Sequence, residues 1–378
     1  MASDSAVHIL FVGAGAVGCF YASRLHHPSQ HIYTSLTARS NYVAIAKSGV
    51  SLHTRSFGDY NFRPYAVFPS VDAAVPNSPS SAGQNGGQPP PPSSGWDCII
   101  MTTKALPDRT DDAAMIAPLV SAKTCIVLIQ NGVGVEEPYR KHFPQNPIVS
   151  AVTIVSAEQI SQGVIRQNRW TRISLGPYNH GLGAKGGKQP PAIYAAGGGD
   201  NNSDSELVRR GHECMAKLAR WWTDLGGIRD VETHTEMELQ TIRWHKLCIN
   251  AAFNPTAVLS GGRGNADQLT DPELREHIVG IMNEIWNAAP QVLGQPFNHE
   301  SVATPDRIVR SNERNSGAKP SMLLDWEAGR PMELEVILGN PVRIARACGV
   351  EMPKLQTLYA LLRSMQKTRE ERAAKEKL

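Results

Sequence analysis

The stretch that decides the fold is VHILFVGAGAVG, residues 7–18. Its first half is apolar and almost continuous, which is typical of a strand buried on both faces of a parallel sheet. The glycines follow this strand directly and open a helix that we predict from Ala16 to about His26. This order of strand, glycine loop and helix favours a dinucleotide-phosphate cradle over a glycine-rich turn in an unrelated α/β protein.

The three glycines have separate predicted roles within this loop. Gly13 permits the tight turn, Gly15 lets the backbone approach a pyrophosphate, and Gly18 lets the helix pack closely against the strand. The free N–H groups at the start of the helix then point at the phosphates. We therefore expect cofactor contacts from every residue of the loop, namely Gly13, Ala14, Gly15, Ala16, Val17 and Gly18.

The end of the second predicted strand indicates which dinucleotide binds. This strand, HIYTSLTAR at 31–39, ends in Arg39, where NAD-binding folds usually carry an acid for the ribose 2′-hydroxyl. An arginine pairs well with a 2′-phosphate, which favours NADPH; the alternative is a solvated arginine at a strand end. Lys104 ends the strand pattern WDCIIMTTK at 96–104 and is expected to add a second positive charge near the cofactor.

The chain changes character near residue 232. Strands and helices alternate up to that point, which predicts an α/β fold with a Rossmann-type doubly wound sheet. VIRQ at 164–167 and TRISLG at 171–176 resemble two short strands at the edge of this sheet. After it we predict only helices, at 235–253, 271–293, 300–316, 333–347 and 354–375. The expected domains are therefore 1–232 for the cofactor and 233–378, all helical, for the substrate and catalysis.

Two segments of the first domain lack core-forming residues. Residues 76–95 are rich in Pro, Ser and Gly, and residues 179–204 are rich in Gly. Such compositions predict disordered surface inserts.

Composition excludes several classes of protein. The 378 residues carry a net charge of only +3, without a basic stripe, so no nucleic-acid partner is expected. No apolar run is long enough for a membrane span, and no targeting segment is seen, so a cytoplasmic protein is the default expectation. The six cysteines are far apart, which favours buried thiols in a reducing compartment and no metal site.

A polar stripe lies on an otherwise apolar helix in EMELQTIRWHKLCINAAFNP, residues 236–255. Lys246, Asn250 and Asn254 are spaced four apart and therefore share one helix face. A lysine in apolar company can have a lowered pKa and can donate a proton to a carbonyl oxygen, while amides can bind substrate oxygens. The alternative is a solvent-facing stripe. Pro255 is expected to end or kink this helix.

These segments together resemble the ketopantoate reductase family (2-dehydropantoate 2-reductases). The resemblance rests on four motifs in the family's order: GAGAVG at 13–18, QNGVG at 130–134, WHKLCINAAFNP at 244–255 and SMLLDWEAGRPMELEVILGNPV at 321–342. It implies a Rossmann domain, a helical domain and the NADPH-driven reduction of a small 2-keto acid. Ketopantoate, used for pantothenate and coenzyme A synthesis, is the leading substrate.

The resemblance also implies roles for single residues. Lys246 falls on the catalytic lysine and Glu333 on the assisting acid, although an acid at a helix start can also be purely structural. Asn131 matches an asparagine that touches cofactor and substrate. Substrate-binding positions are matched by Asn250, Asn254 and Ser321, and cofactor contacts by Arg39 and Lys104. Met332 and Glu335 depart from the family pattern, so a reductase of another 2-keto or β-keto acid, or a non-catalytic NADPH sensor, stays an alternative.

Overall fold

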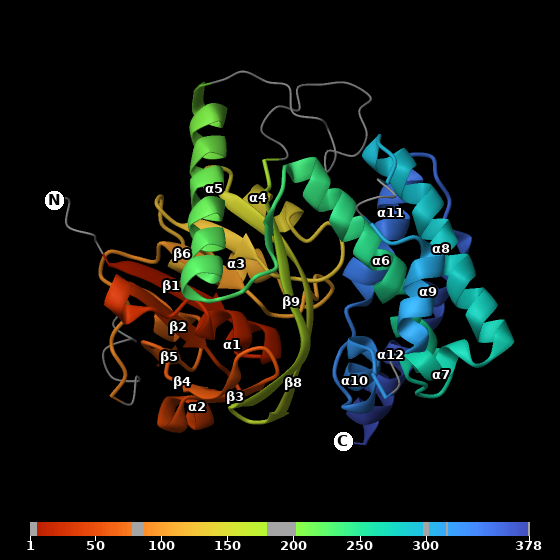
Figure 1. Cartoon of the computed structure of the whole chain (residues 1–378), viewed down its shortest axis with the longest axis horizontal. Helices are drawn as coiled ribbons and strands as arrows, with labels where there is room; N and C mark the ends of the chain where they lie inside the picture. The colour runs from red at the N-terminus through yellow and green to blue at the C-terminus, as the bar shows by residue number, and fades with distance from the viewer. Residues whose placement is uncertain (1–5, 78–86, 180–201, 298–301, 315–316, 377–378) are drawn as a thin grey trace.

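The computed structural model describes residues 6–77, 87–179, 202–297, 302–314 and 317–376. The N-terminal part is built on one sheet of ten strands, in the order β4-β3-β9-β8-β7-β6-β1-β2-β5, with β10 beside β9 (Figure 1). The pairs β8–β9 and β3–β4 are antiparallel and the other pairs are parallel. The strands are β1 (Val7–Val12), β2 (Ile32–Thr37), β3 (Val50–Thr54), β4 (Gly58–Phe62), β5 (Val67–Phe68), β6 (Cys98–Met101), β7 (Cys125–Leu128), β8 (Ile148–Ser161), β9 (Val164–Pro177) and β10 (Val231–Thr233).

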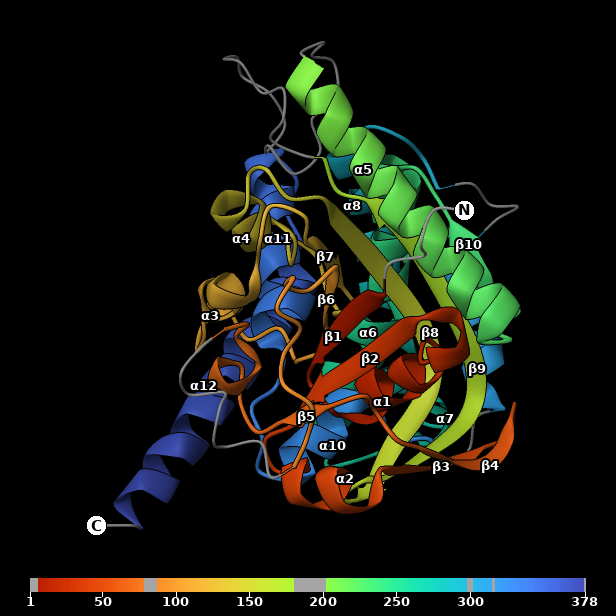
Figure 2. The same ribbon diagram turned by 90° about the vertical axis from the view of Figure 1, so that its left-hand side faces the viewer.

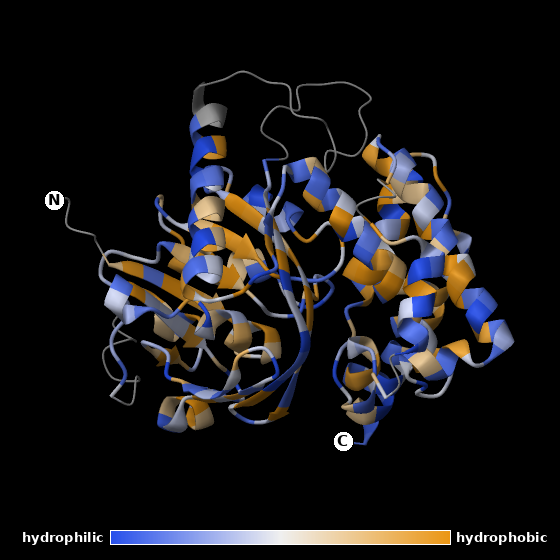
Figure 3. Cartoon of the chain, viewed as in Figure 1, coloured by the Kyte–Doolittle hydropathy of each residue, from blue (hydrophilic) through white to orange (hydrophobic). Residues whose placement is uncertain are grey.

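Helices cover both faces of this sheet, as a doubly wound fold requires. The alternating residues of β1 show the two layers. Ile9 and Phe11 pack toward α1 (Ala16–Ser23) and α5 (Asn202–Arg220). Leu10 and Val12 pack toward α3 (Asp112–Ile116) and α4 (Glu137–His142). Figure 3 shows hydrophobic residues concentrated in the strands between these layers. The continuous apolar run of β1 is therefore explained by burial on both sides.

The C-terminal part is helical and has its own hydrophobic core. Figures 1 and 2 show it beside the sheet, where α6 contacts β8 and β9. Its helices are α6 (Glu236–Leu259), α7 (Asn265–Leu269), α8 (Pro272–Leu293), α9 (Pro305–Glu313), α10 (Ser321–Glu327), α11 (Asn340–Ala347) and α12 (Pro353–Lys375), with a π-helical turn at Glu335–Gly339. The fold class read from the sequence is thus confirmed. The boundary at 232/233 stays a prediction.

Short helical segments complete the chain. They are α2 (Tyr42–Ser48), the 3₁₀ turns Pro28–Gln30, Asp72–Ala74 and Ala117–Leu119, and a second π-helical turn at Trp221–Leu225. None of the described helices is long and apolar enough to cross a membrane.

Three local predictions were wrong or incomplete. Residues 164–177 form one strand, β9, because it pairs along most of its length with the equally long β8. The strands β3 and β4 escaped notice because β4 is the edge strand beside β3, and polar residues of both strands are exposed. Pro255 does not end α6, which continues to Leu259, because Phe253, Ala257 and Val258 are buried in the helical core. The predicted inserts lie largely outside the described residues, at 78–86 and 180–201.

Candidate active site

The glycine loop lies at the carboxyl end of β1 and has the geometry that its sequence predicts. Gly13 has a φ of +113°, a conformation that residues with a side chain rarely adopt. A Cβ atom on Gly18 would come within 2.1 Å of the Gly13 carbonyl oxygen, so α1 approaches the strand closer than alanine allows. A Cβ on Gly15 would meet nothing within 4 Å. The space above Gly15 is therefore open to a ligand, which fits a pyrophosphate lying against the backbone.

Two side chains that sequence reasoning missed hold this loop in place. Thr102, just after β6, donates from Oγ1 to the Gly13 carbonyl at 2.6 Å. Asn41, buried at the start of α2, donates from Nδ2 to the Ala14 carbonyl at 2.7 Å. The loop is therefore fixed from two neighbouring strand ends before any ligand arrives. No local motif indicates these contacts, because their partners lie 27 and 89 residues away along the chain.

The two predicted cofactor cations differ in their surroundings. Arg39 is exposed just beyond β2, and no ion pair to it exists among the described residues. Its guanidinium is therefore free to meet an anion. Lys104 follows β6 but forms an ion pair with Asp325 of α10. Asp325 is buried and also pairs with Arg330 at 3.1 Å. The Lys104 ammonium is thus already paired with a carboxylate of the helical part, and a ligand would not be its only partner.

Lys246, Asn131 and Glu333 form one hydrogen-bonded chain across the two parts of the molecule. Lys246 on α6 donates from Nζ to Asn131 Oδ1 at 2.8 Å. Asn131, after β7, donates from Nδ2 to Glu333 Oε2 at 3.3 Å. The other carboxylate oxygen of Glu333 accepts from the Ala105 backbone N–H at 3.1 Å. Three elements distant in sequence therefore meet at the carboxyl edge of the sheet, where ligands of doubly wound folds bind.

Burial shifts the pKa of both ionisable residues in this hydrogen-bonded series, Lys246 and Glu333. Desolvation and the neighbouring Arg243 guanidinium lower the pKa of Lys246 to about 8, with the Glu333 charge acting in the opposite direction. Desolvation raises the pKa of Glu333, and the hydrogen bonds from Ala105 and Asn131 oppose this rise. A lysine whose pKa lies close to neutral pH is suited to donate and recover a proton.

Arg243 anchors the loop that carries Asn131. Its Nη1 donates to the carbonyls of Gln130 and Gly132, each at 2.9 Å, and its Nη2 donates to Ser150 Oγ at 2.6 Å. Its Nε lies 3.1 Å from Glu136 Oε1, and both side chains are almost completely buried. This buried ion pair joins α6, one helical turn before Lys246, to the start of α4. It is a positioning element that sequence reasoning did not single out.

Of the predicted substrate-binding residues on the helical part, only one lines the same pocket as Lys246. Asn250 lines a small pocket together with Asn131 and Lys246. Asn254 is one turn further along α6 and is buried, yet no hydrogen bond of its amide to another described residue is present. Ser321 is the exposed first residue of α10, and its hydroxyl likewise has no hydrogen-bond partner in the described part of the chain.

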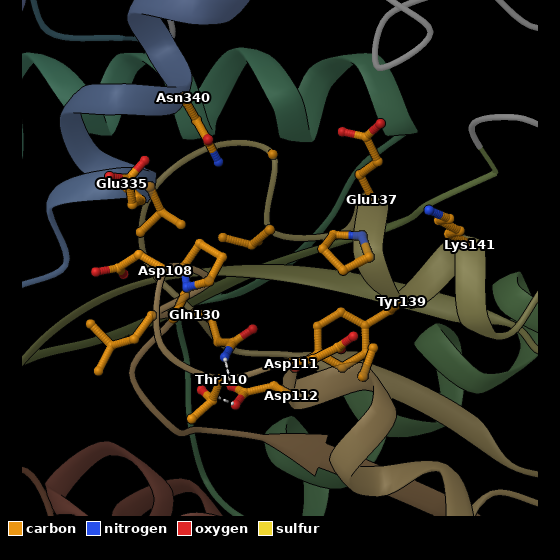
Figure 4. Close-up of a pocket in the computed structure, with 18 of the residues that line it drawn as sticks. Asp108, Thr110, Asp111, Asp112, Gln130, Glu137, Tyr139, Lys141, Glu335 and Asn340 are labelled. Carbon is orange, nitrogen blue, oxygen red and sulfur yellow. Dashed lines mark hydrogen bonds between the residues drawn. The ribbon is translucent and has the colours of Figure 1, made fainter.

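A larger cavity of about 730 Å³ adjoins this network without containing it (Figure 4). It lies between α3 and α4 on one side and α11 on the other. Gln130 and Ala105, the neighbours of Asn131 and Lys104, line it, but none of the predicted site residues does. Glu335 also lines this cavity and pairs there with Arg343. The departure from the family pattern at Glu335 therefore lies on a pocket that Lys246 does not line.

Known proteins share both halves of this architecture. The family model described as Ketopantoate reductase PanE/ApbA matches residues 9–180, and that described as Ketopantoate reductase PanE/ApbA C terminal matches residues 238–366. An uncharacterised protein of Saccharomyces cerevisiae is 27% identical over 96% of this chain and 95% of its own length. A 2-dehydropantoate 2-reductase of Nostoc is 22% identical over 93% of each chain.

Solved structures agree with the sequence matches. The crystal structure of 2-dehydropantoate 2-reductase from Methylococcus capsulatus superposes with a TM-score of 0.72 at 29% identity, covering 96% of this chain and 98% of that one. The two matched family regions contain the glycine loop and Asn131 in one half, and Lys246 and Glu333 in the other. The chain therefore belongs to the ketopantoate reductase family, whose members are oxidoreductases that use a nicotinamide cofactor and act on small keto acids.

Proposed function

We propose that this protein reduces 2-dehydropantoate to pantoate with NADPH, the reduction that supplies pantothenate and coenzyme A synthesis. The observation that carries the proposal is the hydrogen-bonded chain from Lys246 through Asn131 to Glu333. A protein that only senses the cofactor has no need of a half-buried lysine with a pKa of about 8 beside an asparagine and a carboxylate.

The cofactor end of the site fits a dinucleotide phosphate. The space at Gly15 is open, and the hydrogen bonds to the Gly13 and Ala14 carbonyls hold the loop rigid, so that the N–H groups at the start of α1 are free to donate to a pyrophosphate. Arg39 is exposed just beyond β2, the position from which folds of this type contact the 2′-position of the cofactor's ribose. Because the end of β2 offers this cation instead of an acid, the site favours NADPH over NADH.

The reacting end is arranged for proton delivery to a carbonyl oxygen. When bound, the nicotinamide supplies the hydride to the carbonyl carbon of the keto acid. Lys246 stabilises the negative charge that develops on the oxygen and transfers its Nζ proton there. Asn131 holds the Lys246 ammonium in position by accepting its hydrogen bond at Oδ1. Glu333 in turn holds Asn131 in position by accepting a hydrogen bond from Asn131 Nδ2. Asn250 and Asn254 on the same face of α6, with Ser321, bind the carboxylate and hydroxyl oxygens of the substrate.

Steady-state oxidation of NADPH with a panel of keto acids tests this proposal, with the product identified chemically. We expect 2-dehydropantoate to give the highest kcat/KM and pantoate to be the product. If another 2-keto or β-keto acid is reduced and 2-dehydropantoate is not, the protein is a reductase but the proposed substrate is wrong. Binding of NADPH without turnover of any acid would indicate a sensor.

A further inference from the structure

Three cysteines of different segments meet at the edge of the sheet opposite to the proposed active site. Cys98 and Cys125 are the first residues of the neighbouring parallel strands β6 and β7 and are directly paired in register. Cys214 lies on α5, which covers this face of the sheet. Its Sγ is 3.6 Å from the Sγ of Cys98. Among the described residues, no group of three or more His, Cys, Asp or Glu side chains could hold a metal ion.

Cys214 is the least buried residue of this group. Cys98 and Cys125 are buried, whereas Cys214 is half-buried. Arg210, Cys214 and Lys217 are spaced by four and three residues on α5 and therefore share one helix face. Cys214 thus shares this helix face with two cations. Two cations beside the cysteine attract an anionic reagent.

The thiols also differ in acidity. Hydrogen bonds from the Cys125 and Cys214 thiols lower the pKa of Cys98 well below its usual value, and the Lys217 charge acts in the same direction. The same interactions and burial raise the pKa of Cys214. The negative charge of the group therefore rests on the buried Cys98, next to the less buried Cys214. A thiolate in contact with a second sulfur is the arrangement that resolves a mixed disulfide within one protein.

We propose that Cys98 and Cys214 form a dithiol site that exchanges with an anionic low-molecular-weight disulfide of the glutathione type. Transfer of the shared proton from Cys214 to Cys98 exposes a Cys214 thiolate, which attacks the small disulfide and releases one small thiol. Cys98 then loses its proton and attacks Cys214 Sγ, which breaks the mixed disulfide and releases the second small thiol. The Cys98 thiolate and the Cys214 thiol are together oxidised by two electrons, and one small disulfide is reduced by two electrons. The single proton of the pair goes to one released small thiol, and the other takes its proton from solvent.

The resulting cross-link would join α5 to β6 across 116 residues of chain. A disulfide that closes so long a loop restricts the unfolded chain and raises the resistance to unfolding. The Lys246 network lies at the opposite edge of the sheet. Oxidation is therefore expected to raise the melting temperature while leaving the nicotinamide-dependent activity unchanged, and it is measurable whether or not the proposed substrate is correct.

Peptide mapping after oxidation tests this proposal. The reduced, native full-length protein is incubated with glutathione disulfide and acid-quenched, and its remaining thiols are alkylated in denaturant before mass spectrometry. We expect a Cys98–Cys214 cross-linked peptide and a raised melting temperature. Recovery of both cysteines as alkylated thiols, a persistent mixed disulfide at Cys214, or pairing with Cys125 instead would overturn the proposal.

Three cysteine variants test whether the cross-link is specific to Cys98 and Cys214. Cys348→Ser removes a half-buried thiol that has no described cysteine partner and should form the cross-link like the wild type. Cys98→Ser should stop at the mixed disulfide on Cys214, and Cys214→Ser, at a half-buried position, should show neither product. Folding of each variant is checked by circular dichroism. Glutathione disulfide should react several-fold faster than the cationic disulfide cystamine at low salt, and equal rates would contradict the assignment of an anionic reagent.

Discussion

Lys246 Nζ donates a hydrogen bond to Asn131 Oδ1 at 2.8 Å although 115 residues separate them along the chain. The lysine belongs to the helical part and the asparagine to the sheet, so the proposed active site exists only where the two parts meet. Glu333 completes the chain by accepting from Asn131 Nδ2. The account of function therefore depends on how this contact is built and on how it sets the proton affinity of Lys246.

Replacement of Lys246 by Met keeps the length of the side chain and removes its proton. We expect kcat for the keto acid to fall by roughly 10²- to 10⁴-fold, the usual contribution of a general acid, with the dissociation constant for NADPH nearly unchanged. Steady-state kinetics and cofactor titration measure the two quantities. A kcat close to that of the wild type would remove Lys246 from the role of proton donor.

Two of the three loop glycines, Gly15 and Gly18, should respond differently to replacement by alanine. In Gly15→Ala the new Cβ meets no protein atom, so we expect stability to change by less than about 1 kcal/mol while cofactor binding weakens at least about tenfold. In Gly18→Ala the Cβ collides with the Gly13 carbonyl, which should destabilise the fold by about 1–3 kcal/mol or more. Thermal unfolding and NADPH titration separate the effects. Equal loss of stability in both variants would contradict the open cradle at Gly15.

Arg39→Ala tests the choice of cofactor. Loss of one charge-assisted hydrogen bond of about 1.5–3 kcal/mol should weaken NADPH binding by roughly 10- to 100-fold and leave NADH binding almost unchanged. Parallel titrations of both cofactors give the ratio. Lys47→Ala, in the last turn of α2, is a matched control that should alter neither affinity. If Arg39→Ala weakens the binding of NADPH and NADH equally, the arginine does not recognise the 2′-phosphate.

The sequence predicted the parts of this site that follow from local pattern, and missed those that depend on distant partners. The apolar run of β1 and the spacing of Lys246, Asn250 and Asn254 identify a buried strand and a helix face, because the periods of these elements are fixed. The pairing of Lys104 with Asp325 joins residues 221 positions apart, and no local signal marks it. The prediction that Pro255 ends α6 was wrong for a related reason. Burial of the final turn of α6 outweighs the one backbone hydrogen bond that the proline cannot make.

Arg243→Met should strongly destabilise the protein, because it leaves the Glu136 carboxylate buried without its partner. Removing one member of a buried ion pair typically costs about 3–5 kcal/mol. The double variant Arg243→Met/Glu136→Gln should recover part of this loss. Arg310→Met breaks only an exposed pair with Asp306 and should cost less than about 0.5 kcal/mol. Denaturant unfolding measures all four proteins; single variants of equal stability would contradict the anchoring role of Arg243.

The pH dependence of kcat tests most directly the claim that Lys246 donates the proton. Lys246 must be protonated to act, and its pKa is lowered from 10.5 to about 8, so the rate should be full below that pH and lost above it. We predict that wild-type kcat falls about tenfold per pH unit above about pH 8, and that the residual rate of Lys246→Met lacks this limb. A wild-type kcat that stays flat to about pH 10, or the same limb in Lys246→Met, would contradict the account.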